Sequence, residues 1–327
     1  SRLGPGGSTA LRVVFFDVGR ADAALVTLPD GRHVLIDAPG PTRSGWNATT
    51  RRLLPALRRR GVRRLHLVIA SHPHADHVGG LPDVLRALPV RALWHSGIPS
   101  NAPEWQALLG TASRRRVPLR RAESRRFGSV DLQVLAPRRA GRVQPHPLRT
   151  ENDNSLVIRL CHPAGSVLFT GDLEHAGERA LLADGPRIRS TVLKVGHHGS
   201  RTGSGRRFLQ AVSPHLAVIS APARSPDGRF PHPQVLRRLR RAGARTLVTG
   251  REGHVTVEMA PWGIRVTTDR ATFRLPPHGR RTSARWLPPG VPLPLPRTSA
   301  IWIKSRSRDR TPRGWPPAPS GAPWRRR

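Results

Sequence analysis

Residues 65–77 of the chain read LHLVIASHPHADH. The first six of them form a short apolar run of the kind that makes a buried strand. Four candidate metal ligands follow this run, namely His72, His74, Asp76 and His77. Because alternate residues of an extended loop project to the same side, His72 and His74 can share one metal ion. Asp76 and His77 can then face a second ion, and such ligands suit Zn, Mn or Fe.

Two later strand-like runs end in residues of the same kind. Asp172 follows the run Ser166–Thr170 and a glycine that lets the backbone come close, so its carboxylate is a candidate bridge between two metal ions. His197 and His198 follow the run Thr191–Val195 in a glycine-rich loop. One of these two histidines is expected to bind the second metal ion. A lone histidine is more often structural, but three strand-end groups in one chain favour a metal site.

Strand-like apolar runs and helical stretches alternate along residues 11–275, and the last strand-like run is Thr246–Val248. This alternation is typical of a layered α/β domain, in which loops at the strand ends carry the chemistry. Residues 1–10 are small and polar, and are expected to form a flexible segment without the apolar core of a signal peptide. Residues 276–327 hold 12 of the 34 prolines and little apolar periodicity, so a disordered tail is expected there.

The composition bears on partners and location. The formal net charge is +36, carried almost entirely by arginine, which favours binding to nucleic-acid phosphates. A GC-rich coding bias explains an arginine excess equally well, so a polyanion-binding surface and compositional drift both stay open. No run of 18 apolar residues occurs, so no membrane span is expected within this chain. A first residue other than Met suggests a fragment or a trimmed chain.

The single cysteine, Cys161, excludes an internal disulfide and a zinc cluster of several thiolates. It lies in an apolar alternation, where a buried strand thiol is expected. Metal ligands must therefore be His, Asp, Glu, Asn or water.

Three motifs in this order resemble the metallo-β-lactamase superfamily: His-x-His-x-Asp-His at 72–77, Thr-Gly-Asp at 170–172 and Gly-His-His-Gly-Ser at 196–200. Within the superfamily, the chain resembles the C-terminal domain of ComEC-type DNA-internalisation competence proteins over roughly residues 11–260. The supporting segments are Phe16-Asp17-Val18-Gly19, Ala21-Asp22-Ala23, Asn152-Asp153-Asn154-Ser155-Leu156-Val157 and Arg229-Phe230-Pro231-His232-Pro233.

The resemblance implies a fold and a set of metal ligands. The fold is an α/β (α+β) four-layer αββα sandwich, with two divalent metal ions between loops at one sheet edge and no organic cofactor. His72 and His74 would hold one ion. Asp76 and His77 would hold the other, and Asp172 would bridge the two.

The resemblance also assigns roles to three further histidines. It favours His197 as the last metal ligand, which makes His198 a supporting or proton-transfer residue. His232 becomes a candidate for binding substrate or protonating the leaving group.

Two departures from the superfamily pattern stand out. Many members carry a histidine ligand just before the strand that starts at Ser155, where this chain reads Glu-Asn-Asp-Asn, as ComEC-like domains do. An oxygen ligand is then expected for the first metal ion, which favours Mn slightly over Zn. The usual Gly-Gln-Gly-Asp loop reads Gly19-Arg20-Ala21-Asp22, which would let Arg20 face the substrate.

These features predict metal-assisted hydrolysis. Two cations would polarise a phosphoryl oxygen and lower the pKa of a bridging water to about 7. Asp76 or Asp172 could accept the proton of the water, and His198 or His232 could donate one to the leaving oxygen.

Three functions stay open. The first is a phosphodiesterase or nuclease acting on DNA in a DNA-uptake system, with DNA as substrate, a membrane channel as partner, and a location in the cytoplasm or at a membrane through that partner. The second is a hydrolase of a small ester or phosphoester, such as a phosphocholine esterase or lactonase relative. The third is a catalytically weak nucleic-acid-binding module. The oligomeric state is open.

Overall fold

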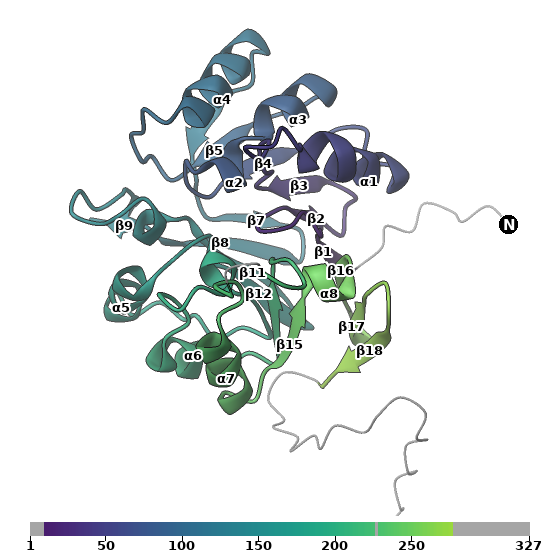
Figure 1. Ribbon diagram of the computed structural model, residues 1–327, viewed down its shortest axis with the longest axis vertical. Helices are drawn as coiled ribbons and strands as arrows, with labels where there is room; N and C mark the ends of the chain where they lie inside the picture. The colour runs from purple at the N-terminus through teal and green to yellow at the C-terminus, as the bar shows by residue number, and fades with distance from the viewer. Residues whose placement is uncertain (1–9, 226–227, 277–327) are drawn as a thin grey trace, which may run out of the picture. The chain divides into compact units, whose positions relative to one another are not determined.

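Two mixed β-sheets face each other in the computed structural model, which describes residues 10–225 and 228–276 (Figure 1). All of these residues belong to one unit, Ser1–Thr282. The predicted tail at 276–327 lies outside the described residues except for Pro276, and the predicted flexible segment at 1–10 does so except for Ala10.

The first sheet has nine strands in the order β18-β17-β16-β1-β2-β3-β4-β5-β6. Its strands from β18 to β3 are antiparallel neighbours, and β3 to β6 are parallel. The bounds are β1 Leu11–Phe15, β2 Ala24–Thr27, β3 His33–Ile36, β4 Leu67–Ala70, β5 Leu93–His95, β6 Leu119–Arg121, β16 Val255–Ala260, β17 Gly263–Thr267 and β18 Thr272–Leu275.

The second sheet has seven strands in the order β15-β14-β13-β12-β11-β8-β7. The strands β12 to β15 run parallel, and β7, β8, β11 and β12 are antiparallel neighbours. The bounds are β7 Arg125–Phe127, β8 Val130–Ala136, β11 Val157–His162, β12 Gly165–Phe169, β13 Val192–Lys194, β14 Leu216–Ile219 and β15 Arg245–Val248. A separate two-stranded ribbon consists of β9 Arg138–Arg139 and β10 Arg142–Val143.

Helices cover the outer face of each sheet (Figure 1). On the first sheet these are η1 Thr49–Leu53, α1 Leu54–Arg59, α2 Ala75–Val78, α3 Leu81–Ala87 and α4 Pro103–Arg114. On the second they are α5 His175–Ala183, α6 Arg206–Val212 and α7 Pro233–Arg241. Short turns of helix occur at η2 Asn152–Asn154, η3 Gly196–Gly199 and α8 Thr249–Glu252.

The core follows from the two-residue period of the strands. In β4, Leu67 and Ile69 pack between the two sheets, while Val68 and Ala70 pack under the first helical layer. In β12, Phe169 faces the inner core, where its ring lies 5.7 Å from that of Phe15 on the opposite sheet. Full burial of a Leu, Ile, Val or Phe side chain stabilises a fold by about 1.5–3 kcal/mol. The predicted four-layer αββα sandwich is confirmed.

Local signals set most of the element ends. The helical stretch formed by η1 and α1 stops before Gly61, whose φ of +73° suits glycine. Cys161 lies in β11 as predicted but is only half-buried, and its Sγ accepts a hydrogen bond from Arg159 Nη1 at 2.9 Å.

Over residues 10–225 and 228–276, no helix is long and apolar enough to cross a membrane.

Candidate metal centre

The candidate site lies where parallel strands of both sheets end. β4 ends at Ala70 and leads into the 72–77 motif, β12 ends at Phe169 and leads to Asp172, and β13 ends at Lys194 and leads into η3. The carboxyl ends of parallel strands are the usual position for ligand-binding loops in α/β sheets. Residues far apart in the sequence therefore meet in one place.

Gly171 makes the turn that delivers Asp172. Its φ is +51°, and a Cβ at this position would lie 2.8 Å from Cβ of Ser155. The backbone N–H of Asp172 then donates to Ser155 Oγ at 3.1 Å, while Leu156 N donates to the carbonyl oxygen of Ser71 at 2.9 Å. The loops of the two sheets are thus tied to each other beside the motif.

One group of four side chains has the geometry of a metal site. The candidate ligand atoms of Asp76, His77, Asp172 and His198 all lie within 4.8 Å of one another. His77 Nε2 is 3.1 Å from Asp172 Oδ1, and His198 Nε2 is 3.3 Å from Asp76 Oδ2. The structure therefore brings together Asp76, His77 and Asp172, which were expected as ligands from the sequence. The fourth member, His198, is one of the two histidines that the sequence offered as a further ligand.

A second group adjoins the first through Asp172. His72 Nε2 lies 3.9 Å from Asp172 Oδ2 and 3.1 Å from His74 Nδ1. His74 Nε2 in turn lies 2.9 Å from Glu151 Oε2. Asp172 thus lies beside histidines of both expected metal positions, as a bridging carboxylate would.

Glu151 was not singled out from the sequence. An oxygen ligand was expected from the segment before Ser155, and Glu151 is the carboxylate of that segment that reaches His74. Asn152 Oδ1 of the same segment is buried without a hydrogen-bond partner. In place of a histidine, this segment therefore offers the side-chain oxygens of Glu151 and Asn152 as candidate ligands.

The two histidines of η3 have different surroundings, although both have a positive φ, +45° at His197 and +49° at His198. His198 is buried, and its Nδ1 faces the carbonyl oxygen of Ser220 at 3.0 Å. His197 is partly exposed, with Nδ1 2.8 Å from Glu174 Oε1 and Nε2 3.9 Å from Asp172 Oδ2. The geometry places His198 in the group of four and His197 at its rim, whereas the resemblance favoured His197 as the ligand.

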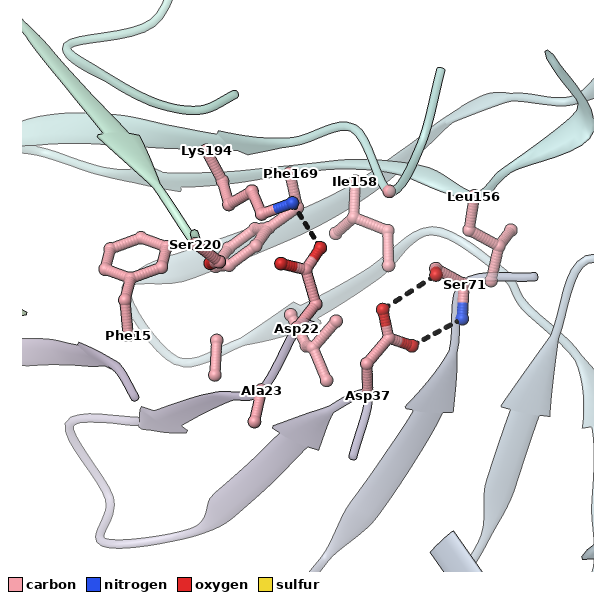
Figure 2. Close-up of a pocket in the computed structure, with 13 residues that line it drawn as sticks. Phe15, Asp22, Ala23, Asp37, Ser71, Leu156, Ile158, Phe169, Lys194 and Ser220 are labelled. Carbon is pink, nitrogen blue, oxygen red and sulfur yellow. Dashed lines mark hydrogen bonds and ion pairs between the residues drawn. The ribbon is translucent and has the colours of Figure 1, made fainter. Parts of the chain in front are cut away.

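Further polar side chains adjoin the histidines, and Figure 2 shows four of them, Asp22, Asp37, Ser71 and Lys194. Asp37 Oδ2 is 2.8 Å from His77 Nδ1 and accepts a hydrogen bond from Ser71 Oγ at 2.7 Å. Asp22 forms a buried ion pair with Lys194. Asp37 and Lys194 went unnoticed in the sequence. Both occupy strand ends, which was the signal that revealed the other residues.

The electrostatics of the group suit ionised carboxylates and a neutral His72. Burial alone would raise the pKa of Asp172, but His77 and His198 hold it well below its usual range. Burial also opposes ionisation of Asp76, yet its hydrogen bond with His198 keeps the pKa below the usual range. Burial and the nearby His77 lower the pKa of His72, which makes it neutral at ordinary pH, the form that binds metals.

His77 lies between the carboxylates of Asp172 and Asp37. Burial would lower its pKa, but Asp172 and Asp37 raise it well above the usual value. His77 Nε2 and Asp172 Oδ1 are both buried, and neither makes a hydrogen bond although they lie 3.1 Å apart. A divalent cation between these two atoms would satisfy both and replace the proton, so the residues present fit a metal ion.

His232 lies near the site but outside the group. Its backbone N–H donates to the carbonyl oxygen of Gly199 at 2.9 Å, while its Nδ1 accepts from Gln234 N at 3.2 Å and caps α7. Among residues 10–225 and 228–276, two sets of side chains have ligand atoms close enough to share a metal ion, and neither set includes His232. The structure thus places it beside η3 as a helix cap.

Phe230 and Arg20 form the rim next to η3. The Phe230 ring lies 5.7 Å from the ring of His197 and 6.3 Å from that of His198. The Arg20 guanidinium stands 5.1 Å over the Phe230 ring and is exposed. A cationic and aromatic edge therefore borders the candidate centre.

The sequence profile of the metallo-beta-lactamase superfamily matches residues 17–223, and the chain belongs to this superfamily. The fold and its His/Asp groups agree with the family in defining the class, metal-dependent hydrolases of the metallo-β-lactamase fold.

Three curated bacterial proteins are relatives of this chain. It is 30% identical over 257 residues to ComE operon protein 3 of Bacillus subtilis, covering 74% of this chain and 32% of the relative. It is 31% identical over 258 residues to Recombination protein 2 of Haemophilus influenzae (79% and 30%). It is 30% identical over 256 residues to Competence protein ComA of Neisseria gonorrhoeae (77% and 33%). The chain therefore spans about a third of the length of these relatives.

Proposed function

We propose that this chain is a metal-dependent phosphodiesterase that cleaves DNA. The observation that carries the proposal is the position of Asp172, whose carboxylate lies beside three histidines: Oδ2 is 3.9 Å from His72 Nε2 and 3.7 Å from His198 Nε2, and Oδ1 is 3.1 Å from His77 Nε2. Such a shared carboxylate is the arrangement that a two-metal hydrolytic site needs.

The residues of the two groups would hold two divalent cations. Asp76, His77, Asp172 and His198 would hold one. His72, His74 and Asp172 would hold the other, with Glu151 or Asn152 as the oxygen donor. When bound, the cations supply Lewis acidity toward a phosphoryl oxygen and lower the pKa of a water molecule.

The remaining side chains orient these ligands and the substrate. Asp37 holds Nδ1 of His77, which leaves Nε2 for the metal. His197, fixed by Glu174 at the rim, can donate a proton to the leaving oxygen in place of the buried His198. Arg20 is suited to contact a phosphate next to the scissile one.

DNA as the substrate has two supports. The net charge of +36 favours a polyanion, and two relatives are a recombination protein and a competence protein by name. A membrane-channel partner, expected from the resemblance, stays a prediction. The choice between zinc and manganese likewise depends on a measurement.

The experiment compares DNA cleavage by three proteins. Single- and double-stranded DNA are incubated with wild type, Asp172→Ala and Asp184→Ala in the presence of Mn²⁺, Zn²⁺ or Mg²⁺. Asp184 is exposed at the end of α5, so its variant controls for loss of a carboxylate. We expect cleavage by wild type and Asp184→Ala, and none by Asp172→Ala. Wild type that binds metal but cuts only a small phosphodiester would contradict DNA as substrate.

A further inference from the structure

A buried ion pair lies directly behind the group of four metal-site residues. Lys194 ends β13, and Asp22 lies in the loop before β2, so the pair joins the two sheets. Their side chains are only 4% and 8% exposed. Figure 2 shows the ammonium group and the carboxylate pointing toward one another. Burying two charges costs solvation energy, and a well-packed apolar pair is often at least as stable. Fold stability alone is therefore a weak reason for this pair.

The position of Asp22 suggests another reason. Its Oδ2 lies 3.7 Å from His77 Nδ1, and its Oδ1 lies 3.6 Å from His198 Nδ1. Its backbone N–H also donates to the carbonyl oxygen of Asp76 at 3.1 Å. One residue thus faces three members of the group of four. The direct partners of the two Nδ1 atoms are Asp37 Oδ2 and the carbonyl oxygen of Ser220, so Asp22 acts on both rings through its charge.

We propose that Lys194 is a positioning residue for the metal centre. By holding Asp22 behind His77 and His198, it keeps a negative charge next to both Nδ1–H groups. That charge favours the tautomer in which both Nε2 atoms present lone pairs toward Asp172. The consequence is tighter binding of a divalent cation by the group of four. The inference rests on the metal site of the proposed function and does not depend on DNA.

Lys194 also accounts for a cluster formed by Asp22, Asp37 and His77. Ligand atoms of Asp22, Asp37 and His77 lie within 4.8 Å of one another, which would suit a further cation. The ammonium group of Lys194 already contacts Asp22, and His77 Nδ1 is bonded to Asp37. Lys194 therefore supplies the positive charge that a bound cation would otherwise bring to this cluster. The cluster supports the metal centre and is not a third metal site.

The test measures metal affinity and metal-free stability separately. Purified metal-free wild type, Lys194→Met, Asp22→Asn and the double variant are titrated with Mn²⁺ and with Zn²⁺ by calorimetry, and their Tm is recorded without metal. Met259→Ala is the matched control, because Met259 is fully buried in β16 and its truncation opens a cavity away from the centre. Lys194→Gln, which retains a hydrogen-bond donor, replaces Lys194→Met if the latter does not fold.

We expect Lys194→Met to weaken binding of the divalent ion by about 10- to 100-fold, the range found for residues that support metal ligands. The double variant is expected to lose less affinity than the product of the single losses, because the two residues act as a pair. Met259→Ala should lower Tm and keep the wild-type dissociation constant. A wild-type dissociation constant for Lys194→Met would overturn the proposal, and so would an additional bound ion in that variant.

The readout keeps this proposal separate from the proposed function. Wild type that binds metal ions without cutting DNA would contradict the nuclease and leave the role of Lys194 standing. Wild type that cuts DNA, together with a Lys194→Met variant of unchanged metal affinity, would contradict only the role of Lys194.

Discussion

Asp172 Oδ1 lies 3.1 Å from His77 Nε2, and both atoms are buried without a hydrogen bond. The two residues follow β12 and β4, strands of opposite sheets. A buried acceptor facing a buried imidazole in this way is costly unless a proton or a cation lies between them. A divalent cation bound by both residues would remove this cost, and the predictions below test whether the centre binds one.

Asp172→Asn should abolish binding at one or both metal positions. The substitution keeps the size of the side chain but removes the charge that Asp172 presents to His72, His77 and His198. We expect the affinity for Mn²⁺ or Zn²⁺ to fall at least about 100-fold, beyond the usual effect of a supporting residue. Calorimetric titration measures this, with Asp184→Asn at an exposed position as the control. An unchanged stoichiometry and affinity would exclude Asp172 as a ligand.

Metal ions should raise the thermal stability of the folded chain. An ion that binds only the folded state adds about 2.7 kcal/mol when its concentration is about 100 times the dissociation constant. For a domain of this size, that corresponds to an increase in Tm of about 5–10 °C. Thermal unfolding with and without Mn²⁺, followed by addition of a chelator, measures the shift. A Tm that changes neither with Mn²⁺ nor with the chelator would argue against a metal site in the folded state.

His198 and His197 should separate metal binding from catalysis. His198 is in the group of four, whereas His197 is bonded to Glu174 at the rim. His198→Ala is therefore expected to lose a bound ion, as elemental analysis would show. His197→Ala is expected to keep both ions and to lose at least about 100-fold in kcat, the contribution of a general acid. The opposite outcome, with the ion lost in His197→Ala, would restore the assignment drawn from the resemblance.

Arg20→Gln should weaken the response of DNA cleavage to salt. Arg20 is exposed beside Phe230 at the rim, where a phosphate next to the scissile one would lie. Loss of one phosphate contact is expected to reduce the slope of log(kcat/KM) against log[salt] by about one. Arg270→Gln, an exposed arginine in the turn before β18, is the control. Equal slopes for both variants would remove Arg20 from the DNA-binding surface.

His95 should make the fold acid-sensitive. Burial and, to a lesser extent, Arg121 lower the pKa of His95 to about 4, and its Nδ1 accepts from Gly97 N at 3.1 Å. Between pH 6.5 and 4 the unfolded chain therefore binds a proton at His95 that the folded chain does not. Stability is full above pH 6.5 and falls as the pH drops toward 4, by about 2 kcal/mol after allowance for partial exposure. Urea unfolding of wild type and His95→Gln at both pH values tests this, since the variant should lose less.

Much of the fold was predictable because strand and helix periods are local. The runs at Leu65–Ala70 and Ser166–Thr170 are short apolar stretches of the kind that strands buried on both faces need, and they appear as β4 and β12. The strands β16 to β18 were missed, although Val255, Val257 and Met259 alternate with polar residues as in a half-buried strand. Their place beside β1, at the other end of the chain, depends on pairing that no local pattern encodes.

The sequence by itself determined the class of centre, since the 72–77 motif, Asp172 and the histidine pair each follow a strand-like run and have side chains that bind metals. The tertiary structure alone decided which of these side chains come together. It chose His198 over His197 for the group of four, brought Glu151 to His74, and placed Lys194 and Asp22 behind the histidines. The physical reason is that a ligand set is a matter of distances of a few ångströms between loops of different sheets. Those distances depend on how the two sheets pack.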